Sequence, residues 1–152
     1  MSRQDVTRGA STAVGSALYG LATRAVRRLP RDQSLTSAAT LATLDRTGPR
    51  RITDLAVIEG VTQPAMTVLV RVLEESGLVE RRSDASDKRV TLVCLTEAGA
   101  SYVQTRRQAG VQAFARLIDE LTDDEIEALV AALPALQHLS ELEHQDREGA
   151  KQ

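Results

Sequence analysis

The chain has 152 residues and a mass of 16.4 kDa, a size that suits one domain with a few appended helices. Its 42% hydrophobic and 26% charged residues match a globular protein, no apolar run reaches the roughly 20 residues of a membrane span, and a single cysteine excludes an internal disulfide framework. The net charge is only −2, and acidic residues are concentrated in 96–152, so the whole chain has no electrostatic bias toward nucleic acid. We expect a cytoplasmic protein with no membrane partner.

The N-terminal third predicts two helices. Apolar residues recur at steps of three or four over 10–29, and Pro30 ends the pattern. Ser34 or Thr36 can cap a second helix, which ends before the turn signal at Gly48.

Two short helices separated by a tight turn are predicted next. The first covers about 52–59 and ends at Gly60. The second covers about 62–76, with Thr62 as its N-cap and Gly77 in the left-handed position that follows a helix.

The pattern then changes to a β-hairpin over about 78–95, with a charged loop between two β-rich runs. Thr96 caps a long helix that runs to about Leu121. The segment Thr122–Glu125 is a capping box, and it opens a last helix with leucines along one side and a kink predicted at Pro134.

This order of elements is that of a winged helix-turn-helix. The predicted fold class is therefore mainly α with a small β-hairpin wing (α+β), in which a winged helix-turn-helix core carries long N- and C-terminal dimerisation helices. Such a core places its second helix, 62–76, in the DNA major groove and its hairpin on the adjacent backbone and minor groove. Thr62, Gln63 and Thr67 are short polar side chains suited to base edges.

Three blocks of sequence carry a resemblance to a known family. They are Leu73–Arg81, with Leu-Glu followed by Gly-Leu-Val and Arg, then Asp87–Val90, with Asp-x-Arg, then Leu95–Gly99, with Leu-Thr-x-x-Gly. Asp54-Leu55-Ala56 also matches the family's helix before 62–76, the helix expected to read the DNA bases and called the reader helix below. The chain resembles the MarR family of bacterial winged-helix transcriptional regulators over nearly its whole length.

The resemblance implies a homodimer that binds a pseudo-palindromic double-stranded DNA operator, usually as a repressor that a small ligand or an oxidant releases. A helix of about 25 residues over 96–121 is about 37 Å long, and leucine-lined terminal helices need a second subunit to cover them. The expected organisation is a single MarR-type domain over 1–152, dimerisation helices at 10–30 and 96–145, and a winged-helix DNA-binding region at 34–95, with its reader helix at about 62–76 and its wing at about 78–95.

The predicted DNA contacts are concentrated on the reader helix and the wing. Arg89 matches the family's wing-tip arginine, which enters the minor groove, with Asp87 orienting it; the alternative is a surface ion pair. Arg81 has an equally good structural role in holding the wing. Val68 and Val72 stand where many relatives have a polar residue. The full set of predicted DNA-binding residues is Arg50, Arg51, Thr62, Gln63, Pro64, Thr67, Arg71, Arg81, Asp87, Lys88 and Arg89.

An effector pocket for a phenolic or lipophilic molecule is predicted between the winged-helix core and the dimerisation helices, although its lining residues are equally good core: Leu18, Tyr19, Leu41 and Phe114. Cys94 is expected to be buried and inert. His138, Glu141 and His144 lie three apart on a helix and favour a solvated surface over a metal site.

No nucleophile–base pair or phosphate-binding loop is present in the sequence, so we predict neither an enzyme nor a cofactor. The competing interpretation is a winged-helix dimer that acts as a protein–protein interaction module without a specific operator.

Overall fold

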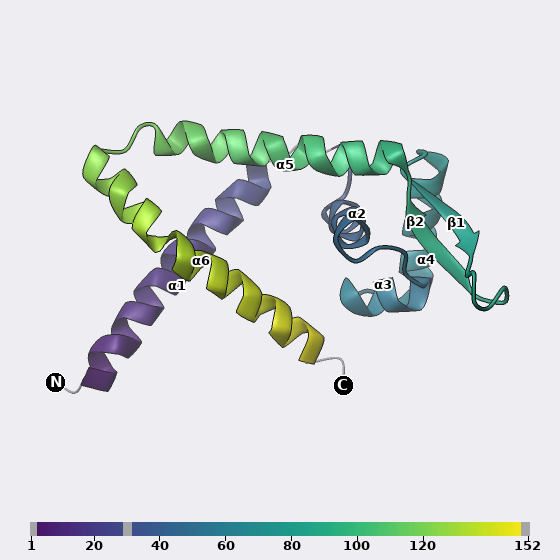
Figure 1. Cartoon of the computed structure of the whole chain (residues 1–152), viewed down its shortest axis with the longest axis horizontal. Coiled ribbons are helices and arrows are strands. Elements are labelled where there is room, and N and C mark those ends of the chain that lie inside the picture. The colour runs from purple at the N-terminus through teal and green to yellow at the C-terminus, as the bar shows by residue number, and fades with distance from the viewer. Residues whose placement is uncertain (1–2, 29–31, 150–152) are drawn as a thin grey trace. The chain divides into compact units, whose positions relative to one another are not determined.

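The computed structural model describes residues 3–28 and 32–149, with side chains for 9–25 and 32–142 (Figure 1). The chain divides into two compact units, Met1–Gly110 and Val111–Gln152. The elements follow one another as α1 (Arg3–Arg28), α2 (Leu35–Thr47), α3 (Ile52–Ile58), α4 (Gln63–Glu75), β1 (Val79–Ser83), β2 (Thr91–Leu95), α5 (Glu97–Ile118) and α6 (Asp123–Gly149). The predicted fold class, mainly helical with a two-stranded antiparallel hairpin, is confirmed.

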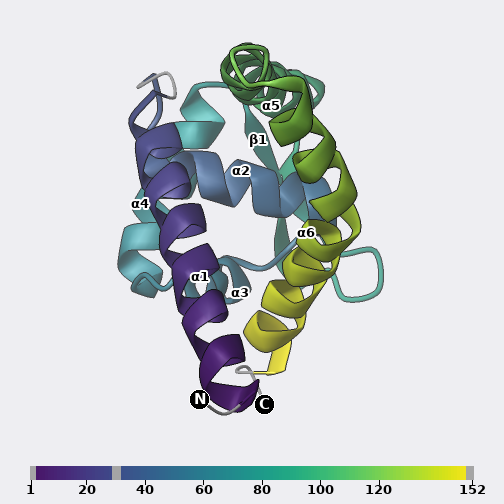
Figure 2. The same ribbon diagram turned by 90° about the vertical axis from the view of Figure 1, so that its left-hand side faces the viewer.

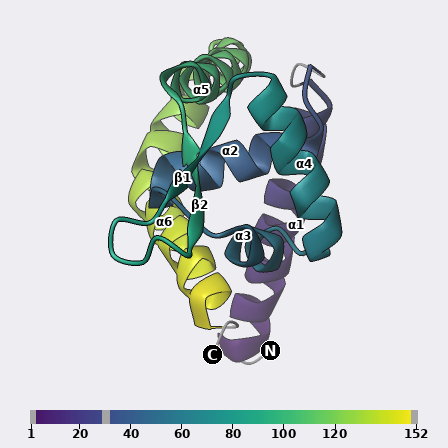
Figure 3. The same ribbon diagram turned by 90° about the vertical axis from the view of Figure 1, so that its right-hand side faces the viewer.

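The core of the first unit lies among α2, α3, α4 and the hairpin. α2 runs across one side of α4 and the hairpin, in front of them in Figure 2 and behind them in the opposite view of Figure 3. Each of these elements turns aliphatic side chains inward, as expected for a chain with few aromatic residues. The buried cluster comprises Leu41, Leu44, Leu55, Ala56, Met66, Val70, Leu73, Val79 and Val93.

Of the two caps predicted for α2, Ser34 is the one used. Its side-chain oxygen accepts a hydrogen bond from the Ser37 amide at 3.0 Å, which satisfies a free N–H of the first turn. At the other end, Gly48 adopts a φ of 74°, and its amide donates to the Leu44 carbonyl.

The hairpin pairs Val79 with Leu95 and Ser83 with Thr91 in an antiparallel register. A third segment joins it, because Arg50 exchanges two backbone hydrogen bonds with Val93, at 3.1 and 2.8 Å. The sequence analysis did not predict this bridge, since a one-residue strand has no periodicity to detect.

The terminal helices also differ in detail from prediction. α1 begins at Arg3, whereas the apolar pattern predicted a start at residue 10. The earlier turns were not predicted because they are polar and carry no apolar periodicity. Pro30 lies outside the described residues. The capping box before α6 is confirmed: the Thr122 amide donates to Glu125 Oε2 at 2.9 Å and the Glu125 amide donates to Thr122 Oγ1 at 3.4 Å. α6 continues through Pro134 as one helix.

Within the described residues, no single helix is long and apolar enough to cross a membrane. One bent pair, α3 with α4, meets that requirement of length and composition when its two helices are taken together.

Candidate nucleic-acid interface

A helix-turn-helix is formed by α3 and α4. The two helices bend by 109° at the short break that contains Gly60, within the roughly 90–120° typical of this motif. Gly60 adopts a φ of 65°, a left-handed conformation that favours glycine, and the Val61 amide closes the turn on the Ala56 carbonyl at 3.0 Å.

The turn is tied to α2 by a side-chain hydrogen bond. Thr43 is buried, and its hydroxyl donates to Glu59 Oε1 at 2.8 Å. This contact joins the C-cap of α3, at the start of the turn, to α2. This pair has no distinctive signal in the sequence, because the buried face of α2 also contains Ser37 and Thr40, so Thr43 does not stand out.

One face of α4 is buried and the other is open. Met66, Val70 and Leu73 are fully buried, whereas the predicted contact residues Gln63, Pro64, Thr67 and Arg71 are all exposed. The N-cap at Thr62 is confirmed, because its side chain accepts from the Ala65 amide at 3.4 Å. The exposed face of α4 therefore gathers the predicted reader residues on one element.

Two of these reader side chains already have partners on their own helix. The Thr67 hydroxyl donates to the Gln63 carbonyl at 2.9 Å. The Arg71 Nε lies 3.8 Å from Glu75 Oε1, and both side chains are about two-thirds exposed, so this ion pair is weak. Arg71 can exchange Glu75 for a phosphate at little cost.

The wing tip is ordered by the carboxylate of Asp84. One oxygen, Oδ1, accepts from the Ser86 hydroxyl at 2.6 Å, the Ser86 amide at 2.7 Å and the Asp87 amide at 3.4 Å. These hydrogen bonds, that from the Ser86 hydroxyl first, lower the pKa of Asp84 below its ordinary value, because they stabilise the ionised form. The loop thus keeps a defined turn at neutral pH while it projects from the strands (Figure 3).

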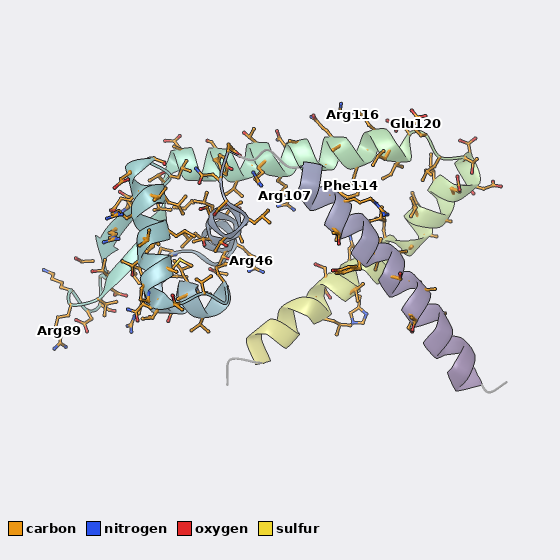
Figure 4. The ribbon with its side chains drawn as sticks, turned by 180° about the vertical axis from the view of Figure 1, so that it is seen from behind. Arg46, Arg89, Arg107, Phe114, Arg116 and Glu120 are labelled. Atoms are coloured by element: carbon orange, nitrogen blue, oxygen red, sulfur yellow. The ribbon has the colours of Figure 1, made fainter. Side chains whose placement is uncertain are left out.

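Arg89 lies at the outer end of this loop and points away from the strands (Figure 4). Its side chain is 92% exposed, and Asp87 Oδ1 accepts from both its Nε at 3.2 Å and its backbone amide at 3.0 Å. This contact is the surface ion pair that was the alternative for Arg89. It also orients the Arg89 side chain, and entry of that side chain into a DNA groove stays a prediction. Lys88 beside them is exposed.

The other predicted basic contacts occupy different settings. Arg81 Nε lies 3.5 Å from Glu74 Oε2, so it joins β1 to α4 and has the structural role that was the alternative for this residue. Arg50 donates from Nε to Thr47 Oγ1 at 3.1 Å, while Arg51 is exposed at the N-cap position of α3. Contact of any of them with DNA stays a prediction.

A polar cluster connects the segment before α2 with α5. Asp32 Oδ1 accepts from Tyr102 Oη and from Arg106 Nη1, each at 3.2 Å, and the Arg106 side chain is only 12% exposed. Burial and then the hydrogen bond to Asp32 raise the pKa of Tyr102 above its ordinary value. No local pattern encodes this cluster, because Asp32 is 70 residues from Tyr102 and 74 from Arg106.

The four predicted pocket residues have different environments. Leu41 is fully buried in the winged-helix core, Leu18 is half-buried on α1 and Tyr19 is 76% exposed there. Phe114, on the part of α5 in the second unit, is 39% exposed (Figure 4). Their common role in a pocket stays a prediction.

Two further expectations concern Cys94 and metal binding. Cys94 is buried, as expected. No group of three His, Cys, Asp or Glu placed to bind a metal is found among the described residues, and the side chain of His144 lies outside them.

Comparison with known proteins gives concordant matches. The model of the MarR family matches residues 34–91, from the N-cap of α2 to the start of β2. The uncharacterized HTH-type transcriptional regulator Mb0904 of Mycobacterium bovis is 32% identical over 99 residues, which are 65% of this chain and 69% of the relative.

Two solved structures show the same fold. Transcriptional regulator Tm0710 of Thermotoga maritima has a TM-score of 0.77 at 20% identity, covering 88% of this chain and 98% of its own. MepR of S. aureus bound to ethidium bromide has a TM-score of 0.58 at 24% identity, covering 93% of this chain and 97% of its own.

Proposed function

Because the chain belongs to the MarR family of winged-helix transcriptional regulators, we propose that it binds a pseudo-palindromic DNA operator as a homodimer and represses transcription from it. The observation that carries the proposal is the helix-turn-helix with a 109° bend, whose α4 leaves the face with Gln63, Thr67 and Arg71 open beside a wing ending in the exposed Arg89. Two-fold symmetry places two such surfaces about one turn of DNA apart.

The two parts of the surface have different tasks in this proposal. α4 enters the major groove, where Gln63 and Thr67 face base edges. The wing follows the backbone, so that Arg89 reaches the minor groove and Lys88 contacts a phosphate. Arg50 and Arg51 contact phosphates before α3. The chain is nearly neutral overall, so this local clustering supplies the attraction.

The proposed dimer uses the helices outside the winged-helix core. Their large apolar side chains are unusually exposed in the single chain, which is the mark of a surface that a partner covers. These residues are Val14 and Leu21 on α1, Val111, Leu117 and Ile118 on α5, and Leu129, Val130, Leu133, Leu136, Leu139 and Leu142 on α6. All of these exposed apolar residues lie within 10–30 and 96–145, the segments predicted to be dimerisation helices. Their position supports the predicted division of the chain into DNA-reading and dimerising parts.

Replacing Arg89 with alanine tests the DNA-binding proposal. We expect Kd for the operator to rise about tenfold at moderate salt, because each subunit loses a cation from the groove. The slope of log Kd against log salt becomes shallower by about 0.9 per subunit. The measurement is a fluorescence-anisotropy titration at several salt concentrations, on sites selected from random duplex DNA.

Arg107→Ala is the matched control, since Arg107 is an exposed arginine on α5, away from the wing (Figure 4). It should leave both affinity and salt slope unchanged. If the selection enriches no site, operator binding is contradicted and the protein-interaction module is favoured. If a site is enriched but the wild type and Arg89→Ala have equal salt slopes on it, Arg89 does not contact the DNA.

We also propose that a small phenolic or lipophilic effector weakens operator binding. The fold neighbour MepR has been solved with ethidium bromide bound, which supports a ligand-responsive fold. Leu18 and Tyr19 on α1 are the proposed contact residues of this effector. Titration of phenolic and lipophilic acids into the operator complex should identify a compound that raises Kd about tenfold, and Tyr19→Ala should reduce that response. A regulator without an effector would show no change for any compound.

A further inference from the structure

The centre of the open face of α4 is apolar. Val68 is 53% exposed and Val72, one turn later, is 44% exposed, although Met66 and Val70 beside them are fully buried. At 100° per residue Val68 lies about 160–200° around the axis from these two buried residues, directly opposite the core. Val68 is therefore not part of the buried cluster that holds α4.

Val68 also shares a stripe with residues of the proposed DNA surface. Pro64 precedes it by four residues and Arg71 follows it by three, the spacings that bring side chains together on one helix face. Both neighbours are exposed. If α4 enters the major groove, this stripe faces the bases, with Val68 at its middle and Arg71 positioned for the backbone.

The chemistry of valine limits what it can recognise there. Its side chain neither donates nor accepts a hydrogen bond, and the apolar group that bases present in the major groove is the C5 methyl of thymine. At a cytosine the same side chain would instead displace water from an amino group without replacing its hydrogen bond.

We propose that Val68 is a specificity-determining residue that contacts the C5 methyl of one thymine in each operator half-site. The inference rests on the proposed function, because it requires α4 to lie in the major groove. Gln63 and Thr67 then read neighbouring pairs by hydrogen bonds, and Val68 selects thymine over cytosine by apolar contact.

The test replaces thymines of the selected operator with deoxyuridine, one symmetric pair at a time, which removes the C5 methyl and leaves the base pairing intact. For the wild type we expect one position at which Kd rises about fourfold per half-site, the effect of losing one buried methyl group, or about fifteenfold for both half-sites. At the same position Val68→Ala should bind the thymine and deoxyuridine duplexes equally well. Such a double-mutant cycle isolates the contact from other effects of either change.

Val57→Ala is the matched control, since Val57 is an exposed valine on α3 and not on the reader helix. It should retain the full deoxyuridine effect. Folding of Val68→Ala is not at risk, because the residue is exposed and alanine favours helix more than valine.

Failure of this inference is distinguishable from failure of the proposed function. If random selection enriches no site, operator binding is wrong and the inference falls with it. If a site is enriched but no thymine is sensitive to deoxyuridine, or if Val68→Ala keeps the wild-type sensitivity, the operator proposal stands and the assignment of Val68 is overturned.

Discussion

Replacing both Leu129 and Leu136 with glutamate should leave the protein as a monomer of about 16.4 kDa at concentrations where the proposed wild-type dimer forms. These leucines are 41% and 37% exposed in the single chain and lie seven residues apart, on the same stripe of α6 as Leu133. In the proposed dimer they are covered, and an unpaired carboxylate in a covered apolar surface costs several kcal/mol. The symmetry of a dimer introduces each carboxylate twice.

We expect the dissociation constant of the dimer to rise at least a hundredfold, which is about 2.7 kcal/mol, measured by sedimentation equilibrium. Operator affinity should fall with it, because a monomer presents one reader helix to one half-site. Circular dichroism of the variant establishes whether its helices remain formed.

The matched control adds the same two carboxylates to the other side of α6, as Ala131→Glu with His138→Glu. Both positions are exposed and lie about 200° around the axis from Leu129 and Leu136 respectively. Because His138 is adjacent on the helix face only to Leu142 among the exposed leucines of α6, this control should weaken the dimer far less than the leucine pair does. A leucine variant that stays dimeric would show that the subunits meet through a surface other than this stripe of α6.

Gly99→Ala should destabilise the winged-helix unit by about 2–3 kcal/mol. A Cβ atom at Gly99 would lie 2.1 Å from the Leu78 carbonyl oxygen and 2.8 Å from Leu95 Cδ1, closer than real Cβ contacts permit. The carbonyl has little room to retreat, because it accepts from the Thr96 amide at 3.1 Å while the Thr96 hydroxyl donates to the Gly77 carbonyl at 2.7 Å. The start of α5 must therefore move away from the strand, at a cost typical of overpacking.

Urea denaturation followed by circular dichroism at a fixed protein concentration measures this loss, since dimerisation makes apparent stability depend on concentration. The expected loss already allows for the gain of about 1 kcal/mol that alanine brings to a helix. Gly9→Ala is the control: no atom of the described residues lies within 4 Å of its added Cβ, so its stability should stay equal or rise slightly. An unchanged midpoint for Gly99→Ala would contradict the close approach.

Most helix ends were predictable because the chemistry that sets them is local. Ser34, Thr62 and Thr122 each satisfy amides within three residues, and Gly77 takes a φ of 72° directly after α4. The start of α1 was not predictable in this way, since a polar helical turn has no apolar face to reveal it.

The sequence motifs single out candidate site residues, but they do not reveal the contacts among them. Motif matching selected Arg89 and Asp87, and the structure joins them through one carboxylate oxygen. It could not show that Arg81 is joined to Glu74, because that distance depends on how β1 packs against α4.

The sequence by itself determined the order of elements, the apolar stripes and the caps, because periodicity and capping act over a few residues. The sequence also contains the Leu-Thr-x-x-Gly pattern over 95–99, but it does not reveal why a glycine is required there. Only the tertiary structure decided that Gly99 is needed where α5 passes the Leu78 carbonyl, that Thr43 holds Glu59, and that Arg50 bridges Val93. Each of these contacts joins residues distant in the chain, so no local pattern encodes it, and each exists only once the aliphatic core has brought the elements together.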